Sequence, residues 1–267
     1  MSDKTAAPMI PAATVLLVRR AEPQLQVFMV VRHHQIDFAS GALVFPGGKL
    51  EAADGDERLI PRIGGIDVAS DQLRAFRVAA IREAFEECGV LLARARGERT
   101  LVSPERLKRL EADWRAKLAK DEASILDMVE AEDLELAAEL MLPYSHWITP
   151  TFMKKRFDTW FFIAEAPDDQ LAVHDGHESV DSVWISPSQA LADLEARRRT
   201  IIYPTRLNLM LLDQSATVAQ ALDSTRARRI ATVLPWVEES GGRKWLKIAP
   251  DSGFPMVDSP IDPVMRA

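Results

Sequence analysis

The sequence predicts an α/β fold, because strand-like runs alternate along the chain with stretches typical of helices. The strand-like runs are apolar and β-branched, and the helical stretches are charged with apolar residues at helical spacing. The chain has 267 residues, of which 47% are hydrophobic, so it suits one large domain with a packed core.

The first half contains four predicted strands and one predicted helix. Residues 13–19 and 25–32 form two apolar runs separated by a short Pro-containing segment, which predicts a hairpin. Residues 42–45 predict a third strand. Residues 72–88 predict a helix that ends before Gly89, and a short strand is expected at residues 90–93.

The second half begins with a long charged segment at residues 103–142. Ser103 and Pro104 are typical of a helix start, and the segment contains no Gly, so we expect a helical insertion of two or three helices. Further strands are expected at 159–165, 180–185 and 245–248, and further helices at 186–199, 204–212 and 215–230. Residues 1–11 and 251–267 are expected to be loose ends.

Three glutamates are grouped on the predicted helix 72–88. Glu83, Glu86 and Glu87 are spaced i, i+3 and i+4, so their carboxylates share one helix face. The opposite face carries Val78, Ile81, Phe85 and Cys88, which would pack against a core. Such an acidic face is either solvated, as charge clusters commonly are, or gathered around a divalent cation.

A pair of glycines precedes this helix. Gly47 and Gly48 follow the strand-like run 42–45, where they allow the backbone to turn and to approach a ligand closely. Together the two segments resemble the Nudix box, Gly-x5-Glu-x7-Arg-Glu-U-x-Glu-Glu-x-Gly-U, in which U is a bulky apolar residue. The matching positions are Gly48, Arg82, Glu83, Glu86, Glu87, Gly89 and Val90.

The sequence departs from this pattern at three points. Asp54 replaces the first Glu, and Ala84 replaces the first bulky apolar residue. The seven-residue spacer is expanded to 27 residues, 55–81. Pro61 and the pair Gly64-Gly65 lie within this expansion, so residues 55–72 are expected to form a surface insertion that leaves Gly48 close to Glu83.

The resemblance implies an α/β/α sandwich with a mixed sheet, in a Nudix hydrolase domain spanning about residues 12–250. It further implies that Glu86 and Glu87 bind Mg²⁺, with Mn²⁺ as a substitute, and that Glu83 is either another ligand or the base that activates water. Arg82 is expected to orient a carboxylate such as Glu86, and Gly47 and Gly48 to offer backbone contacts. Oxygen-only ligands suit these hard cations.

Other segments resemble the branch of this family that contains the peroxisomal coenzyme A diphosphatases, among them His146 to Pro150 and Arg156 to Thr159. A coenzyme A pattern ahead of the box is matched at Arg32 and Gly41, but Asp37 stands where its second Arg belongs. A carboxylate there repels phosphate. Arg32 and Arg156, with Lys154 and Lys155, are the candidate phosphate-binding residues, and Glu178 is an alternative base.

Composition excludes several classes of partner. The net charge is −7 and the pI is near 5.4, which argues against a nucleic-acid or acidic-membrane binder. No apolar run is long enough to span a membrane, and the first eleven residues do not resemble a signal peptide. Cys88 is the single cysteine, so no internal disulfide forms, and we expect a cytoplasmic protein.

The expected function is Mg²⁺-dependent hydrolysis of a nucleoside diphosphate linked to another moiety. Coenzyme A or acyl-coenzyme A is the preferred small-molecule substrate, cut to 3′,5′-ADP and a phosphopantetheine product. The alternatives are ADP-ribose or NADH pyrophosphatase activity, and a Nudix domain that senses a ligand without turnover. The sequence leaves the oligomeric state open.

Overall fold

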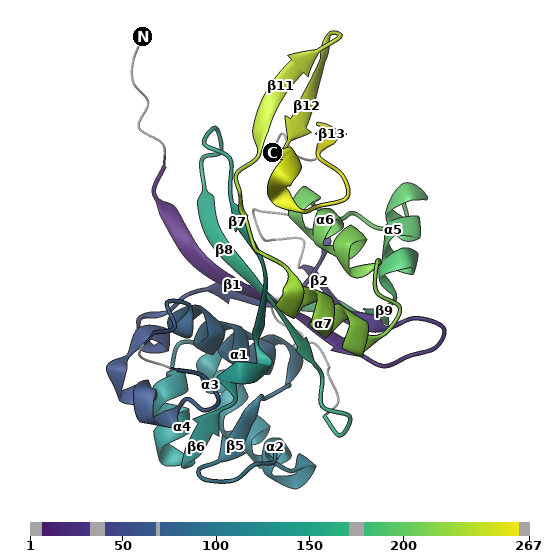
Figure 1. Cartoon of the computed structure of the whole chain (residues 1–267). Helices are drawn as coiled ribbons and strands as arrows, with labels where there is room; N and C mark the ends of the chain where they lie inside the picture. The colour runs from purple at the N-terminus through teal and green to yellow at the C-terminus, as the bar shows by residue number, and fades with distance from the viewer. Residues whose placement is uncertain (1–6, 33–40, 68–69, 171–178, 262–267) are drawn as a thin grey trace.

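A computed structural model describes residues 7–32, 41–67, 70–170 and 179–261. Its centre is a mixed sheet with the strand order β10-β7-β8-β1-β2-β3, in which β4 also pairs with β1 and β9 with β2 (Figure 1). The strands of this sheet are β1 (Met9–Arg19), β2 (Gln26–Arg32), β3 (Leu43–Val44), β4 (Gly47–Lys49), β7 (Leu142–Ile148), β8 (Arg156–Glu165), β9 (Ser179–Ile185) and β10 (Thr232–Val233).

The sheet combines both strand directions. β1 pairs with β8 in parallel, whereas β1 and β2 form the predicted antiparallel hairpin, and β7 and β8 are also antiparallel. The expected strand 159–165 therefore begins earlier, at Arg156, and β7 is a strand that the sequence patterns did not predict.

Helices cover both faces of the sheet, as expected (Figure 1). One core lies between the sheet and the helices formed within residues 74–131, and includes Val15, Phe28 and Phe85. A second core lies on the other face and includes Leu16 and Leu207. That face is covered by α5 (Pro187–Glu195), α6 (Tyr203–Leu212) and α7 (Val218–Ala227). The predicted α/β/α sandwich with a mixed sheet is confirmed.

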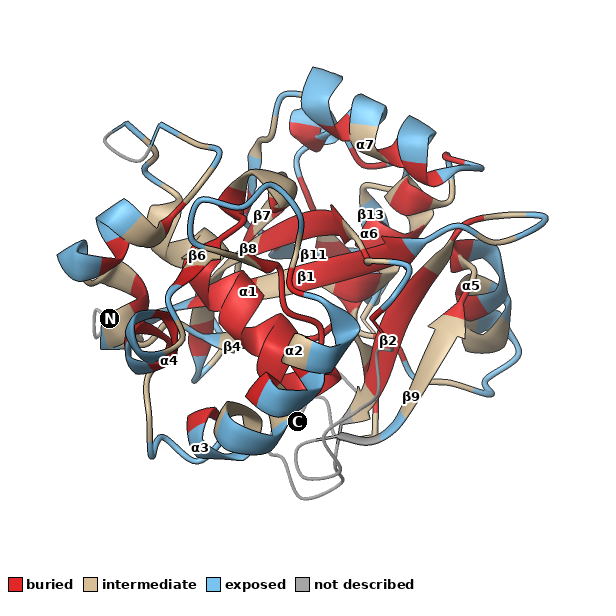
Figure 2. Cartoon of the chain, turned by 90° about the horizontal axis from the view of Figure 1, so that it is seen from below, coloured by how far each residue is buried: buried red, intermediate tan, exposed pale blue. Residues whose placement is uncertain are grey.

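Helix α1 (Arg74–Cys88) corresponds to the predicted helix 72–88, and Gly89 ends it in the left-handed conformation with φ of 71°. Every residue from Val78 to Cys88 is buried, so the acidic face is covered as well as the apolar one (Figure 2). The alternative in which Glu83, Glu86 and Glu87 form a solvated helix face is therefore wrong.

The box insertion is partly internal. Two short 3-10 helices, Ala52–Gly55 and Glu57–Arg62, follow β4, and Leu59 in the second is fully buried in the core. Ile63 bridges to Leu136, and the Gly64 N–H donates to the Leu136 carbonyl at 2.9 Å. The expectation of a purely surface insertion is wrong for this part, because its apolar residues pack against the helical insertion.

The predicted helical insertion at 103–142 contains its α- and π-helical segments within its first thirty residues, and only a short 3-10 turn, Ala138–Leu140, near its end. The α- and π-helical segments are α2 (Pro104–Leu110), a π-helical turn (Glu111–Arg115), α3 (Ala116–Leu118) and α4 (Ile125–Ala131). Its end turns back into strands, because β6 (Leu134–Leu136) pairs with β5 (Ala93–Ala95) before β7 starts at Leu142. The strand expected at 90–93 is thus displaced toward the C-terminus.

The C-terminal part forms a small antiparallel sheet of β11 (Trp236–Ser240), β12 (Arg243–Lys247) and β13 (Asp258–Pro260). The sequence patterns predicted only the middle strand. β13 lies within the stretch expected to be loose, and β1 begins at Met9, also inside an expected loose end. Among the described residues, no helix is long and apolar enough to cross a membrane.

Candidate active site

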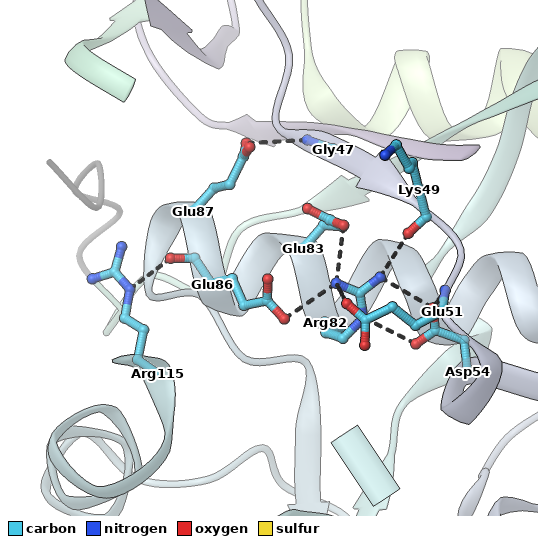
Figure 3. Close-up of polar contacts among 9 residues, drawn as sticks. All are labelled: Gly47, Lys49, Glu51, Asp54, Arg82, Glu83, Glu86, Glu87 and Arg115. Carbon is cyan, nitrogen blue, oxygen red and sulfur yellow. Dashed lines mark hydrogen bonds and ion pairs between the residues drawn. The ribbon is translucent and has the colours of Figure 1, made fainter. Parts of the chain in front are cut away.

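The two halves of the glycine–glutamate motif lie against each other. The Gly47 N–H donates to Glu87 Oε2 at 3.1 Å (Figure 3). A Cβ placed on Gly48 would lie 2.3 Å from Glu83 Oε1. The glycines form β4, a short strand beside β1, instead of an open turn. The expanded spacer therefore leaves Gly48 and Glu83 in contact, as the sequence predicted.

Arg82 lies at the centre of a carboxylate cluster and is 1% exposed. Its guanidinium forms a two-point contact with Asp54, at 3.0 and 3.1 Å, and donates to the Lys49 carbonyl at 2.8 Å (Figure 3). It also lies 2.9 Å from Glu83 and 3.2 Å from Glu86. Arg82 thus contacts Glu86, the carboxylate that it was predicted to orient, and its position in the cluster leaves it pointing away from solvent.

Asp54 and Glu51 complete the cluster. The Glu51 N–H donates to Asp54 Oδ2 at 2.8 Å, and Glu51 Oε1 lies 3.1 Å from the Arg82 guanidinium. Asp54 is 1% exposed. The sequence pattern identified Asp54 only as a departure from the box and did not identify Glu51. The sequence signal that could have identified Glu51 is its position three residues before Asp54, at the start of a helical turn.

The cluster holds more negative charge than its arginine balances. Four carboxylates surround the single guanidinium of Arg82, and Glu87 lies in the next turn. Burial raises the pKa of Glu86 to about 7, although the charge and hydrogen bond of Arg82 act to lower it. Burial also raises the pKa of Glu51. The cluster is therefore electrostatically suited to a cation.

The donor set fits a hard divalent cation in its chemistry. Glu83, Glu86 and Glu87 are all buried, and they supply oxygen ligands only. As the side chains stand, no group of three or more acidic, His or Cys residues in the described part of the chain is close enough to hold an ion. In Figure 3 the carboxylates of Glu83 and Glu86 both contact Arg82, whereas that of Glu87 accepts from the Gly47 N–H.

The other predicted site residues are more distant or lie outside the described residues. Arg156 is buried, and its guanidinium donates to the backbone carbonyls of Thr149 at 3.1 Å and Ala7 at 3.3 Å. These contacts tie the Arg156 side chain to the backbone, and its role in substrate binding stays a prediction. Lys154 and Lys155 are exposed. Glu178, Asp37 and the side chain of Arg32 lie outside the described residues.

The helical insertion contributes a residue that sequence reasoning missed. Arg115 Nε donates to the backbone carbonyl of Glu86 at 2.9 Å (Figure 3). No local pattern marks this arginine, because the contact joins two segments that are 29 residues apart.

Comparison with known families decides the assignment. A family model described as the NUDT19 Nudix domain matches residues 65–212, more than half of the chain. The chain belongs to the Nudix hydrolase family. The matched segment contains the second half of the Nudix box and the whole helical insertion.

Curated relatives carry the same family name. Acyl-coenzyme A diphosphatase NUDT19 of Homo sapiens is 36% identical over 124 residues, which cover 43% of this chain and 33% of the relative. The Xenopus laevis protein of the same name is 26% identical over 232 residues, covering 72% of this chain and 61% of the relative. The chain therefore spans between a third and about three fifths of the length of these two relatives.

A solved structure shares the fold. The crystal structure of a Nudix hydrolase from Alicyclobacillus acidocaldarius superposes with a TM-score of 0.69 and 24% sequence identity. The match covers 81% of this chain and 96% of that chain. The similarity supports the Nudix-type sandwich described above.

Proposed function

We propose that this Nudix chain is a Mg²⁺-dependent diphosphohydrolase that cuts coenzyme A or acyl-coenzyme A. The products are 3′,5′-ADP and phosphopantetheine or its acyl derivative. The observation that carries the reaction class is the buried carboxylate cluster held against β4, in which Arg82 is surrounded by four acidic side chains. The names of the curated relatives support the substrate.

The chain's own residues prepare the cluster for a metal-bound diphosphate. Asp54 fixes Arg82 through two hydrogen bonds, and Arg82 in turn holds Glu83 and Glu86 on the face of α1 that meets β4. The N–H of Gly47 holds Glu87. Gly48 leaves space beside Glu83 that any larger residue would fill. These contacts gather the carboxylates beside β4 before substrate binds, and metal binding would still require Glu83 and Glu86 to turn from Arg82 toward a shared ion.

Glu86 and Glu87 are the proposed main ligands of Mg²⁺, with Mn²⁺ as a substitute, and Glu83 is a further ligand or the base. A bound divalent cation would neutralise the diphosphate charge and lower the pKa of water. In the reaction, a water oxygen bonds to one phosphorus and the bridging P–O bond breaks. The bridging oxygen leaves with the other phosphate, and the water proton passes to a carboxylate and then to solvent.

The first experiment is a substrate panel with Mg²⁺ or Mn²⁺ and products identified by mass. Coenzyme A, acyl-coenzyme A, ADP-ribose and NADH should be compared at equal concentration. We expect metal-dependent cleavage, with coenzyme A forms cut fastest. Preference for ADP-ribose or NADH would reject the coenzyme A assignment and leave the reaction class intact. Binding without turnover of any diphosphate would favour a sensor.

A second experiment tests recognition of the 3′-phosphate. The 3′-phosphate carries up to two negative charges, so an acidic protein needs local Lys or Arg side chains to bind it. We expect faster cleavage of coenzyme A than of 3′-dephospho-coenzyme A, and Arg32→Ala should remove much of that preference. Lys154→Ala tests the exposed basic segment in the same way. Equal cleavage rates of coenzyme A and 3′-dephospho-coenzyme A by the wild-type protein would contradict recognition of the 3′-phosphate.

The proposed partner is a small nucleoside diphosphate derivative, and neither nucleic acid nor a membrane is part of the proposal. A cytoplasmic location stays a prediction.

A further inference from the structure

The last turn of α1 carries the two proposed metal ligands Glu86 and Glu87 and ends one residue later. A helix leaves the carbonyls of its last turn without intrahelical partners. Here the Gly89 N–H donates to the Phe85 carbonyl at 2.9 Å, and the Val90 N–H donates to the Ala84 carbonyl at 3.2 Å. The Glu86 carbonyl instead accepts from Arg115 Nε, at 2.9 Å.

Arg115 comes from an unusual piece of helix. The segment Glu111–Arg115 is a π-helical turn between α2 and α3, and such turns are rare and frequent at functional sites. Glu111 Oε1 lies 3.5 Å from Arg115 Nη1, so the two ends of the turn form an ion pair. The Arg115 side chain is 19% exposed. Its charge beside a helix C-terminus is favourable to the helix dipole.

The π-helical turn packs closely against the C-terminal end of α1 at Gly89. A Cβ at position 89 would lie 2.3 Å from Glu111 Oε1 and 3.1 Å from Arg115 Nη1. The side chains of the insertion thus occupy the space that a side chain at position 89 would need. The glycine of the Nudix box therefore meets two requirements here, a left-handed φ and contact with the insertion.

We propose that Glu111 and Arg115, the Arg115 brace, position the last turn of α1 so that Glu86 and Glu87 are held ready for the metal. This inference rests on the proposed function and extends it, because it gives the helical insertion a role in the active site. Arg115 is a positioning residue, since it contacts the Glu86 backbone. Residues that orient metal ligands typically contribute 10- to 100-fold to affinity or activity.

The test compares Arg115→Ala with Arg106→Ala in the full chain. Arg106 lies in the same insertion and also donates to a backbone carbonyl, that of Glu132, but that contact does not involve α1. For Arg115→Ala we expect Mn²⁺ binding, measured by calorimetry without substrate, to weaken about 10-fold, with kcat falling roughly 10- to 100-fold and KM changing little. Arg106→Ala should leave the Mn²⁺ affinity unchanged.

Hydrogen exchange supplies a readout that does not depend on activity. Amides of Gly89 and Val90 should exchange faster in Arg115→Ala than in the wild type, and Arg115→Lys, which keeps a donor and the charge, should recover part of the protection. If Arg115→Ala folds poorly, the Mn²⁺ affinity, kcat and amide exchange of Arg115→Lys and Glu111→Gln are compared with those of Arg106→Ala instead.

The outcomes separate the two proposals. If the wild-type protein binds Mn²⁺, and Arg115→Ala has the same Mn²⁺ affinity, kcat and amide exchange rates as the wild type, the proposed role of the Arg115 brace is wrong. The proposed function would then be unaffected. A wild-type protein that binds no Mn²⁺ and cuts no diphosphate would overturn the proposed function, and the catalytic role of the brace with it.

Discussion

Two buried arginines in this protein have opposite surroundings. Arg82 lies among four carboxylates, two on α1 and two at the 3-10 turn that follows β4. Arg156, at the start of β8, instead donates to backbone carbonyls of a turn and of the chain before β1. Both arginines were candidate site residues on sequence grounds. A cation outnumbered by buried anions indicates that a further cation is needed, whereas a cation satisfied by carbonyls indicates a structural tie.

The largest expected effect is a loss of activity when the carboxylates of α1 near Arg82 are changed. Glu86→Gln and Glu87→Gln should each lower kcat by roughly 10²- to 10⁴-fold, because stabilisation of charge by the metal is the main catalytic contribution. The fold should persist, since each change relieves repulsion in the cluster. Steady-state kinetics and thermal unfolding measure the two effects, and Glu98→Gln, on an exposed loop, is the control. Near wild-type turnover in a folded variant would refute the metal assignment.

Arg82→Met should destabilise the fold by about 3–5 kcal/mol, because it leaves Asp54 buried without its counter-charge. Urea denaturation measures the loss. The double variant with Asp54→Asn should recover part of it, since the two residues are coupled through one ion pair. Additive losses in the double variant would show that this pair does not hold the cluster together.

Adjacent glycines provide a finer comparison. In Gly47→Ala the new Cβ would meet the Ala13 carbonyl at 2.4 Å, so roughly 1–3 kcal/mol of stability should be lost. In Gly48→Ala the nearest atoms to the Cβ would be those of the movable carboxylate end of Glu83, so stability should change by less than about 1 kcal/mol. Displacement of Glu83 should nevertheless lower kcat, by up to about 10²-fold. Equal effects on stability would contradict this division.

The smallest catalytic effect is expected at Arg156. Arg156→Ala should cost about 1–3 kcal/mol, because buried carbonyl acceptors lose their donor. The kcat and KM for coenzyme A should stay within about twofold of wild type, and denaturation with kinetics on the same preparation tests both statements. A selective rise in KM for coenzyme A over its 3′-dephospho form would support the predicted role of Arg156 in substrate binding.

Local patterns predicted much of the site and less of its surroundings. The spacing of Glu83, Glu86 and Glu87 and the pair Gly47-Gly48 led to the Nudix box despite the 27-residue spacer. The hairpin, α1 and the C-terminal helices followed from apolar periodicity and from caps such as Ser186. Short strands such as β4 and β6 were missed, because two or three residues carry too little periodicity to reveal pairing partners.

The sequence by itself determined the fold class, the family and the carboxylates on one helix face, because these depend on residue spacing within single elements. Only the tertiary structure decided that the acidic face is buried, that Arg82 is shared among Glu51, Asp54, Glu83 and Glu86, and that Arg156 ties backbone. It alone brought Arg115 to the Glu86 carbonyl. Burial and contacts between distant segments arise from packing of the whole chain, and no local pattern encodes them.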